Sequence, residues 1–245
     1  MYAKLKKKYG QNFLIDKNIT NKIVDLINNT SLNILEIGPG DGKLSEEIIK
    51  KKPKNLDLIE IDKDLLDSLK KNFQNYKFVN VINQDILKSN LDKNYDLIIS
   101  NLPYNLSSKI LEKIILSKNV PEIMILMFQK EFAGRLLDKK LNSINSLVNC
   151  FFGVKFKFNV SKNCFRPVPK IESCILKFEK LKRNLIKKNE VESFIEFKRH
   201  IFSYKRKSLR KILKGYNIED SKKFDLRAEK LNLEELIEIF RELKS

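Results

Sequence analysis

Three of the seven glycines in this chain of 245 residues fall within five positions, in the segment Glu36-Ile37-Gly38-Pro39-Gly40-Asp41-Gly42. The segment follows a short apolar run (33–37) and precedes an amphipathic stretch (43–51). Glycines between a strand and a helix permit positive φ and let a ligand approach the backbone where a side chain would clash. A tight strand-to-helix turn needs one such glycine, so three of them indicate a ligand-binding loop.

The first two-thirds of the chain alternate between apolar runs and longer amphipathic stretches. We expect strands at residues 33–37, 56–61, 77–83, 95–100 and 123–128, and helices at 18–29, 43–51, 63–72, 107–116 and 130–137. This alternation predicts an α/β fold with a mostly parallel, doubly wound sheet. Residues 155–160 and 174–178 have strand patterns without a long helix between them, which predicts an antiparallel pair at the sheet edge and seven strands in all.

Strand patterns end near residue 180, and helical patterns follow at 191–202, 205–213 and 233–243. We therefore expect two domains, a larger α/β domain over residues 1–180 and a small all-helical domain over 181–245. The longest apolar run, 123–128, is far shorter than the ~20 residues that cross a bilayer. The first eight residues lack the apolar region of a signal peptide. These features predict a cytoplasmic protein that does not bind a membrane.

Positive charge is concentrated in the C-terminal part of the chain. The whole chain has 49 Lys and Arg against 31 Asp and Glu, a net charge of +18. Residues 180–214 hold thirteen Lys and Arg and three Glu, so 13 − 3 = +10. Dispersed lysine would only improve solubility, whereas a cluster this dense favours binding to nucleic acid over a membrane surface. The residues expected to contact RNA phosphates are Lys205, Arg206, Lys207, Arg210 and Lys211.

Cysteine and histidine usage argues against metal binding. Cys150, Cys164 and Cys174 form no C-x-x-C pair, and His200 is the only histidine. One histidine and isolated cysteines do not complete the usual zinc ligand sets. We expect no metal site and no disulfide framework, and instead three reduced, partly buried thiols.

Acidic residues near the glycine loop indicate which ligand binds there. The loop has the spacing G-x-G-x-G, unlike the G-x-G-x-x-G that holds a dinucleotide pyrophosphate. Glu60 ends the second expected strand, where a carboxylate can bind both ribose hydroxyls of an adenosine. Asp85 follows the third strand, where a carboxylate can accept a hydrogen bond from the adenine amino group. An adenosine with a small tail that lacks phosphate fits these features, and S-adenosylmethionine is such a molecule.

The segment Asn101-Leu102-Pro103-Tyr104 follows the fourth expected strand, at the sheet edge where open α/β proteins bind ligands. The Asn101 side-chain oxygen and the Leu102 backbone carbonyl can accept both N–H bonds of an adenine amine and draw its nitrogen towards tetrahedral geometry. Pro103 fixes the turn, and Tyr104 offers a face on which a flipped-out base can stack. The sequence therefore predicts methyl transfer to an adenine amine.

Together these motifs resemble those of the ribosomal RNA adenine N6-dimethyltransferases, most closely the KsgA/RsmA type that acts on small-subunit rRNA. The matching segments are Gln11-Asn12-Phe13-Leu14, the glycine loop, Asn101-Leu102-Pro103-Tyr104, Phe165-Arg166-Pro167-Val168-Pro169-Lys170 and Arg227-Ala228-Glu229. The resemblance implies a Rossmann-like class I methyltransferase sheet, with S-adenosylmethionine as donor and no metal, and a Phe165 that faces the target base. The donor contacts that it implies are Asn12, Leu14, Gly38, Gly40, Glu60, Asp85 and Asn101.

The resemblance also implies a reaction, N6-dimethylation of two adjacent adenosines in the hairpin loop near the 3′ end of 16S rRNA. It implies a monomer that binds the small ribosomal subunit and needs no protein partner. Two alternatives share the fold, a 23S rRNA adenine dimethyltransferase of the macrolide-resistance type and a non-catalytic nucleic-acid-binding factor. Pro39 and Leu102 differ from the residues usual in the 23S type. The intact glycine loop, both acids and the Asn101–Tyr104 motif argue against lost catalysis.

Overall fold

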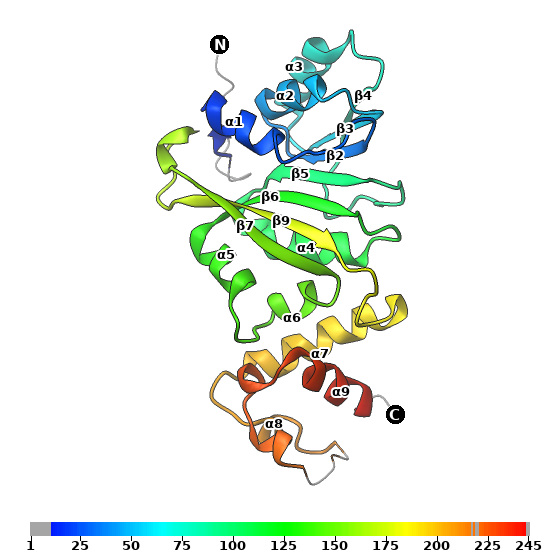
Figure 1. Ribbon diagram of the computed structural model, residues 1–245, viewed down its shortest axis with the longest axis vertical. Coiled ribbons are helices and arrows are strands. Elements are labelled where there is room, and N and C mark those ends of the chain that lie inside the picture. Colours follow the sequence, from blue (N-terminus) through cyan, green and yellow to red (C-terminus); the bar gives the residue numbers. More distant parts are fainter. Residues whose placement is uncertain (1–10, 217, 219–220, 244–245) are drawn as a thin grey trace. The chain divides into compact units, whose positions relative to one another are not determined.

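The computed structural model describes residues 11–216, 218 and 221–243 (Figure 1). By its internal contacts the chain forms two compact units. One unit comprises the chain up to Ala133 together with Lys155–Lys180, and the other comprises Gly134–Val154 and the chain from Leu181 onward. These units differ from the predicted domains 1–180 and 181–245, because Gly134–Val154 is grouped with the chain from Leu181 onward. The division at residue 180 stays a prediction.

A seven-stranded sheet organises the α/β part of the chain (Figure 1). In the order β4-β3-β2-β5-β6-β9-β7, its strands are Val79–Asn83, Asn55–Glu60, Asn33–Ile37, Leu97–Asn101, Ile123–Gln129, Ser173–Lys180 and Phe152–Val160. The pairs from β4 through β6 are parallel, and β9 is antiparallel to β6. The prediction of a mostly parallel sheet of seven strands with an antiparallel edge is confirmed.

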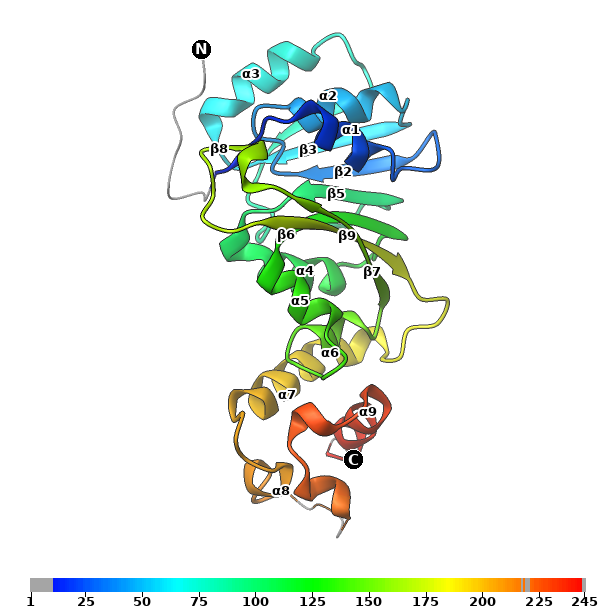
Figure 2. The same ribbon diagram turned by 60° about the vertical axis from the view of Figure 1, so that its left-hand side comes forward.

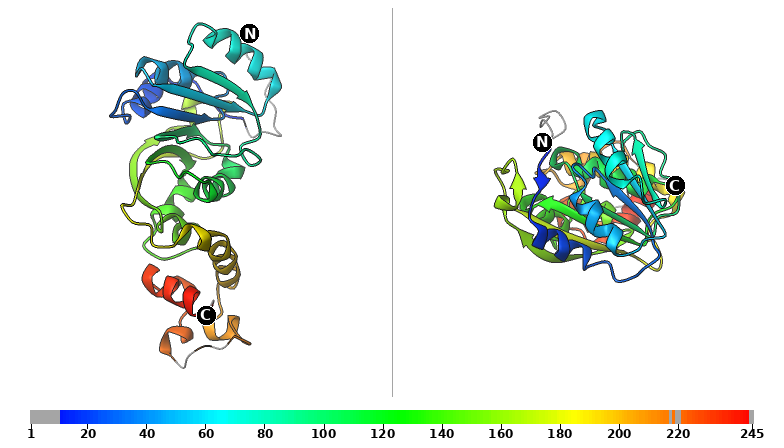
Figure 3. Two further views of the ribbon diagram at one scale, coloured as in Figure 1. Left: turned by 90° about the vertical axis from the view of Figure 1, so that its right-hand side faces the viewer. Right: turned by 90° about the horizontal axis from the view of Figure 1, so that it is seen from above.

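Helices cover both faces of the parallel strands, which explains why these strands are continuous apolar runs. On one face, Ile34, Leu56 and Leu97 belong to a core cluster with residues of α1 (Lys17–Val24), α2 (Lys43–Lys50) and α3 (Lys63–Phe73). The alternate residues Ile98 and Met124 are also buried. In every view α3, in cyan, lies beside β4 at one end of the sheet (Figure 3).

The direction of the crossover connections creates a crevice between β2 and β5. The units β2–α2–β3 and β3–α3–β4 proceed towards one edge of the sheet, while β5–α4–β6 proceeds towards the other. Because such crossovers are right-handed, α4 (Ser107–Leu116) covers the face opposite to α2 and α3 (Figure 2). The order of the strands reverses between β2 and β5, and ligands of open α/β sheets bind at the carboxyl ends of strands at such a point.

Helix α1 begins where the side chain of Asp16 accepts hydrogen bonds from the backbone N–H groups of Asn18 and Ile19. The sequence predicted this helix over 18–29, but it ends at Val24. Beyond it, the N–H groups of Leu26 and Ile27 bond to carbonyls only three residues back, which tightens the last turn. The following segment 28–32 is polar apart from its last residue, so a longer helix would have no apolar side chains to bury there.

Two very short strands pair segments that are far apart in sequence. The first, β1 (Phe13–Leu14), is antiparallel to β8 (Phe165–Arg166), with Leu14 opposite Phe165. Neither strand could be predicted from the sequence, because two residues carry no periodicity. The pairing attaches the N-terminal segment to the loop that precedes β9.

The described part of the second unit is mostly helical, apart from the first residues of β7. Its longer helices are α7 (Val191–Ser203) and α9 (Leu233–Glu242), and α6 (Asn145–Val148) and α8 (Leu209–Ile212) are single turns. The rings of Phe194, Phe197 and Phe240 pack together with centroids 5.1–6.2 Å apart. The remaining helical elements of the described residues, in both units, are α5 (Lys130–Leu137), η2 (Tyr104–Leu106), η3 (Lys162–Cys164), η4 (Lys188–Glu190), η5 (Lys222–Asp225) and η6 (Ala228–Lys230).

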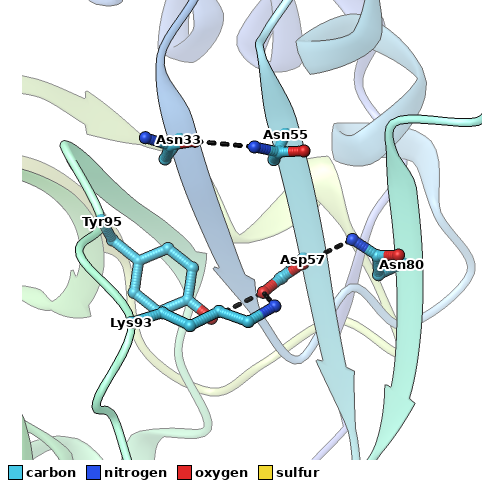
Figure 4. Close-up of polar contacts among 6 residues, drawn as sticks. All are labelled: Asn33, Asn55, Asp57, Asn80, Lys93 and Tyr95. Carbon is cyan, nitrogen blue, oxygen red and sulfur yellow. Dashed lines mark hydrogen bonds and ion pairs between the residues drawn. The ribbon is translucent and has the colours of Figure 1, made fainter.

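A buried carboxylate, that of Asp57, fastens the segment before β5 to the sheet (Figure 4). The Asp57 carboxylate is 2% exposed and accepts hydrogen bonds from Asn80 Nδ2 at 2.8 Å, Lys93 Nζ at 2.7 Å and Tyr95 Oη at 2.7 Å. Burial alone would raise the pKa of Asp57, but the bonds from Lys93, Tyr95 and Asn80 outweigh it and lower the pKa. The cluster therefore stabilises the ionised form.

We expect Asp57→Asn to lower the free energy of unfolding by about 1–3 kcal/mol, because an amide cannot accept all three hydrogen bonds. A lowered pKa contributes stability above the ordinary value of 3.8 that is lost as the pH falls through the folded value. The difference between variant and wild type should therefore shrink in acid. Urea unfolding at several pH values measures it, with the exposed Asp67→Asn as control. Equal effects of the two substitutions would contradict the prediction.

Candidate active site

A cavity lies at the carboxyl ends of β2 and β5, where the strand order reverses. Its walls come from residues 11–14, the glycine loop, the ends of β3 and β4, and residues 101–106. The structure brings together in this cavity all the residues that the sequence predicts as donor contacts: Asn12, Leu14, Gly38, Gly40, Glu60, Asp85 and Asn101. Segments that are remote in sequence thus form one site.

The glycine loop needs its glycines for two different reasons. Gly38 and Gly40 have φ of +67° and +62°, a region that other residues rarely adopt. A Cβ on Gly40 would also lie 2.9 Å from the ring of Phe13, so that this position allows the N-terminal segment to pack against the loop. A Cβ on Gly38 would meet nothing within 4 Å, and the space beside it belongs to the cavity.

Glu60 joins the glycine loop to the end of β3. Its Oε2 accepts a hydrogen bond from the N–H of Gly40 at 3.2 Å, and its Oε1 accepts one from the N–H of Asp62 at 2.8 Å. Burial raises the pKa of Glu60, and the backbone N–H groups oppose this effect. A carboxylate oxygen has a second acceptor site, so both oxygens remain able to bind ligand hydroxyls.

Asp85 lies in the turn after β4 and lines the same cavity, half-buried. Its Oδ1 accepts a hydrogen bond from the N–H of Leu87 at 2.9 Å, which fixes the carboxylate. The neighbouring Ile86 is buried and also lines the cavity. A carboxylate beside an aliphatic side chain can bind the amino edge and one face of an adenine ring.

The orientation of the Asn101 amide follows from one hydrogen bond. Its Nδ2 donates to the backbone carbonyl of Asn12 at 2.9 Å, so the side-chain oxygen is directed away from that contact. The backbone carbonyl of Leu102 comes directly after β5, while the Leu102 side chain is buried. Two acceptors, Asn101 Oδ1 and the Leu102 carbonyl, are therefore adjacent on a segment that lines the cavity.

Tyr104 is held at its phenol end. Its hydroxyl shares a hydrogen bond of 2.8 Å with the hydroxyl of Ser173, the first residue of β9. Burial raises the pKa of Tyr104, so the phenol stays protonated at neutral pH. Pro103 has φ −61° and ψ 122°, an extended conformation from which the short helix η2 starts at Tyr104. The anchored ring offers a face to a planar group in the cavity.

Phe165 is the one predicted residue of the α/β part that the structure does not bring to the cavity. Its side chain is 1% exposed and belongs to the apolar core together with Leu14. Its backbone pairs with Leu14 through β8 and β1. The prediction that Phe165 faces the target base finds no support in this placement, since the residue packs in the core and orders the N-terminal segment.

Sequence reasoning assigned no role of their own to two polar residues that line the cavity, Gln11 and Glu36. Glu36 precedes the glycine loop, lines the cavity, is 1% exposed and accepts a hydrogen bond of 2.6 Å from Ser45 Oγ. Burial raises the pKa of Glu36 from 4.5 to about 8, although the bond from Ser45 lowers it. The sequence feature that could have identified Glu36 is a glutamate between apolar residues of β2, directly before the glycine loop.

We expect Glu36→Gln to stabilise the ligand-free protein increasingly as the pH rises from 4.5 to about 8. Over this range the native glutamate keeps a proton that the unfolded chain loses, so wild-type stability falls with pH, and glutamine removes that dependence. Melting temperatures between pH 5 and pH 8.5 measure the effect. Glu46→Gln, on the exposed side of α2, is the matched control. Parallel pH curves for Glu36→Gln and wild type would contradict the prediction.

The basic segment of the second unit differs from its prediction. Lys205, Arg206 and Lys207 precede the helical turn α8 and do not lie on a helix of residues 205–213. The predicted helix is therefore wrong in its first half. The physical reason is the lack of an apolar face, because among residues 205–213 the fully buried side chains are those of Leu209 and Leu213.

The five predicted RNA contacts have different surroundings. Arg210 Nε donates to Asp225 Oδ1 at 2.7 Å, and its Nη2 donates to the Ser221 carbonyl at 3.2 Å. The other four cations, Lys205, Arg206, Lys207 and Lys211, have exposed side chains. The Lys207 ammonium lies 4.6 Å from the centroid of the Tyr204 ring. Arg210 is therefore held by the protein itself, while the other four are accessible to a polyanion.

Within the described part of the chain, no group of three His, Cys, Asp or Glu side chains could hold a metal ion. The three cysteines are buried free thiols, and burial raises the pKa of Cys150 to about 12. No helix among these residues is long and apolar enough to span a bilayer.

The doubly wound sheet, the glycine loop and the two strand-end acids define a methyltransferase of the class that uses S-adenosylmethionine. The chain belongs to the ribosomal RNA adenine dimethylase family, whose model it matches over residues 2–244. This membership confirms the prediction of a methyltransferase that acts on adenine in ribosomal RNA.

Similar proteins match the chain over nearly its full length. A "Ribosomal RNA small subunit methyltransferase A" from Mycoplasmopsis pulmonis is 39% identical, over 98% of this chain and 99% of the relative. A protein of the same name from a Hydrogenobaculum species is 38% identical, over 98% and 94%. The crystal structure of a dimethyladenosine transferase from Plasmodium falciparum matches with a TM-score of 0.81 and 25% identity, over 95% and 97% of the two chains.

The crystal structure of the 23S rRNA methyltransferase ErmE also matches, with a TM-score of 0.72 and 20% identity, over 95% of this chain and 100% of that one. The likeness shows a shared fold between this chain and a large-subunit enzyme. The fold alone therefore does not separate the two ribosomal substrates.

Proposed function

We propose that this chain transfers methyl groups from S-adenosylmethionine to the N6 atoms of two adjacent adenosines near the 3′ end of small-subunit rRNA. The observation that carries the proposal is the pair of acceptors, Asn101 Oδ1 and the Leu102 carbonyl, on a segment that lines a cavity with strand-end acids. The names of the relatives that match the chain end to end support the small subunit as the substrate.

The residues that line the cavity suit the donor. Glu60 would bind the ribose hydroxyls, and Asp85 with Ile86 would bind the adenine ring. Gly38 would leave room for the ligand, and Asn12 and Leu14 would cover it. Glu36 and Glu60 are buried acids, and a ligand with positive charge favours their ionised forms. When bound, S-adenosylmethionine supplies an electrophilic methyl group on a cationic sulfonium.

The acceptor amine needs activation because its lone pair is delocalised into the adenine ring. The Asn101 side-chain oxygen and the Leu102 carbonyl would accept its two N–H bonds and favour a tetrahedral nitrogen with a localised lone pair. The Tyr104 ring would stack on the extruded base, an interaction worth ~1–3 kcal/mol. Because Phe165 is in the core, we assign the stacking role to Tyr104.

Two alternatives are less well supported. A 23S rRNA enzyme of the macrolide-resistance type would have the same fold, but the relatives reported above carry a small-subunit name. A non-catalytic factor would not need both Asn101 and the acids of the donor cavity, and all of these line one site. We further propose that the protein acts in the cytoplasm as a monomer and that residues 181–245 bind RNA.

We expect Asn101→Ala to reduce single-turnover methylation by ~10²–10³, because it removes an acceptor that acts mainly in the transition state. The assay incubates the protein and labelled donor with small or large subunits from a methylation-deficient strain, and then maps the label. The exposed Asn72→Ala is the control. Label on large subunits would favour the 23S alternative, and a rate within twofold of wild type would remove Asn101 from the chemistry.

The exposed cations Lys205, Arg206 and Lys211 should contact rRNA phosphates. Each lost phosphate contact reduces the slope of log affinity against log salt by about 0.7–0.9. We therefore expect substitution of all three by glutamine to weaken subunit binding and to flatten its salt dependence. Arg210 is left intact because it stabilises its own domain through Asp225.

The matched control for this prediction replaces the exposed Lys63, Lys70 and Lys71 of α3 by glutamine and so removes the same charge from the α/β part. Filter binding at a series of salt concentrations compares the two triple variants. If both change subunit binding equally, the basic segment acts only through net charge. Affinity for S-adenosylhomocysteine should stay unchanged in the variant of Lys205, Arg206 and Lys211.

A further inference from the structure

We propose that Gln11 and Asp62 are positioning residues, which fix the amide of Asn101 through the backbone of the N-terminal segment. The inference rests on the proposed function, because it concerns the orientation of the group that accepts the substrate amine. Neither Gln11 nor Asp62 belongs to the glycine loop or to the Asn101–Tyr104 motif.

Gln11 and Asp62 form a contact between residues 51 positions apart. Gln11 Nε2 donates to Asp62 Oδ2 at 2.8 Å. Asp62 is 1% exposed, and its other oxygen accepts from the N–H of Asp64 at 3.1 Å, which caps α3. The carboxylate is therefore fixed by a helix terminus, and it offers Gln11 a rigid anchor.

The residue after Gln11 holds the Asn101 amide. The carbonyl of Asn12 accepts the 2.9 Å hydrogen bond from Asn101 Nδ2. On the other side, the N–H of Asp62 donates to Glu60 Oε1 at 2.8 Å. A continuous series of contacts therefore joins the ribose-binding acid to the acceptor amide, in the order Glu60, Asp62, Gln11, Asn12 and Asn101.

The other end of the N-terminal segment is fixed separately. Leu14 pairs with Phe165 and is buried, and the Phe13 ring packs where Gly40 leaves space for it. These contacts hold residues 13–14 in place but do not determine where the Asn12 carbonyl points. The contact of Gln11 with Asp62 constrains the segment on the other side of Asn12, so the carbonyl is held between two anchors.

The consequence concerns rotation of the amide. The last torsion of an asparagine side chain has a broad, roughly two-fold preference, so an unrestrained amide can present either its oxygen or its NH₂ to the cavity. An NH₂ group facing the substrate amine would place two donors against each other. The bond to Asn12 selects the orientation in which the oxygen accepts, and Gln11 keeps Asn12 in position.

Gln11 also lines the donor cavity, so an effect on donor affinity must be separated from an effect through Asn101. A double-mutant cycle makes this separation. Gln11→Ala should lower the single-turnover rate at saturating donor by about ten- to a hundredfold, as expected for a misplaced catalytic group. In an Asn101→Ala background the same substitution should change the rate by less than about twofold, since a group that is absent cannot be misplaced.

Reversal of the hydrogen bond provides a rescue. In Gln11→Glu two carboxylates face each other, so the contact breaks and the rate should fall. Adding Asp62→Asn lets the new amide donate to the new carboxylate, with the polarity reversed, and the rate should recover at least fivefold. Gln74→Ala, at an exposed position after α3, should leave the rate unchanged. The dissociation constant for S-adenosylhomocysteine, measured for every variant, reports donor binding separately.

A nuclear magnetic resonance measurement gives a readout that does not need activity. The side-chain amide signals of Asn101, assigned by their loss in Asn101→Ala, should shift in Gln11→Ala and return in the reversed pair. Unchanged Asn101 signals, or rate effects that multiply in the cycle, would overturn the inference. A wild-type protein that methylates neither subunit would contradict the proposed function instead, and the Asn101 signals would still report the positioning.

Discussion

The buried carboxylate of Glu60 binds two backbone N–H groups, and the geometry of the donor site depends on this interaction. The parallel register of β2 and β3 places Ile37 opposite Ile59, and the N–H of Gly38 extends the ladder to the Ile59 carbonyl at 2.9 Å. Glu60, the next residue, therefore reaches the loop after β2 and binds Gly40. Burying an ionised carboxylate is costly unless it is hydrogen-bonded, and the loop and the acid thus require each other.

The acids around the glycine loop also set the charge that the cavity accepts. Burial raises the pKa values of Glu36 and Glu60. The negative charge of a nearby acid raises each pKa further, that of Asp41 for Glu36 and that of Asp62 for Glu60. A site of this kind favours a cation, because a positive ligand restores the ionised forms. Methyl transfer converts a sulfonium into a neutral thioether. Under the proposed function, the cavity would therefore attract the donor more strongly than the spent product, which would favour exchange after each reaction.

Much of the fold could be predicted because parallel strands buried on both faces have an unmistakable pattern. The strand 33–37 and the helix 107–116 have the bounds that the sequence indicates, and the glycine loop lies between a strand and a helix as expected. The errors occur where no apolar face exists. The helix after Lys205 is shorter than predicted because its first residues are charged, and α1 stops before a polar segment. The pairing of β1 with β8 depends on tertiary contact alone.

The lining of the cavity was predictable where a polar side chain lies at or just after a strand end, as Glu60, Asp85 and Asn101 do. It was not predictable where the partner is a backbone group or a distant residue. No pattern in sequence indicates that the Asn12 carbonyl holds the Asn101 amide, or that Arg210 is bound by Asp225. Both contacts change the role that can be assigned to a predicted residue. The first gives a backbone carbonyl a part in orienting the amide, and the second pairs one of the predicted RNA-binding cations with a carboxylate of its own unit. A count of basic residues therefore includes cations that are already paired within the protein. A list of motif residues, in contrast, omits the backbone groups that orient them.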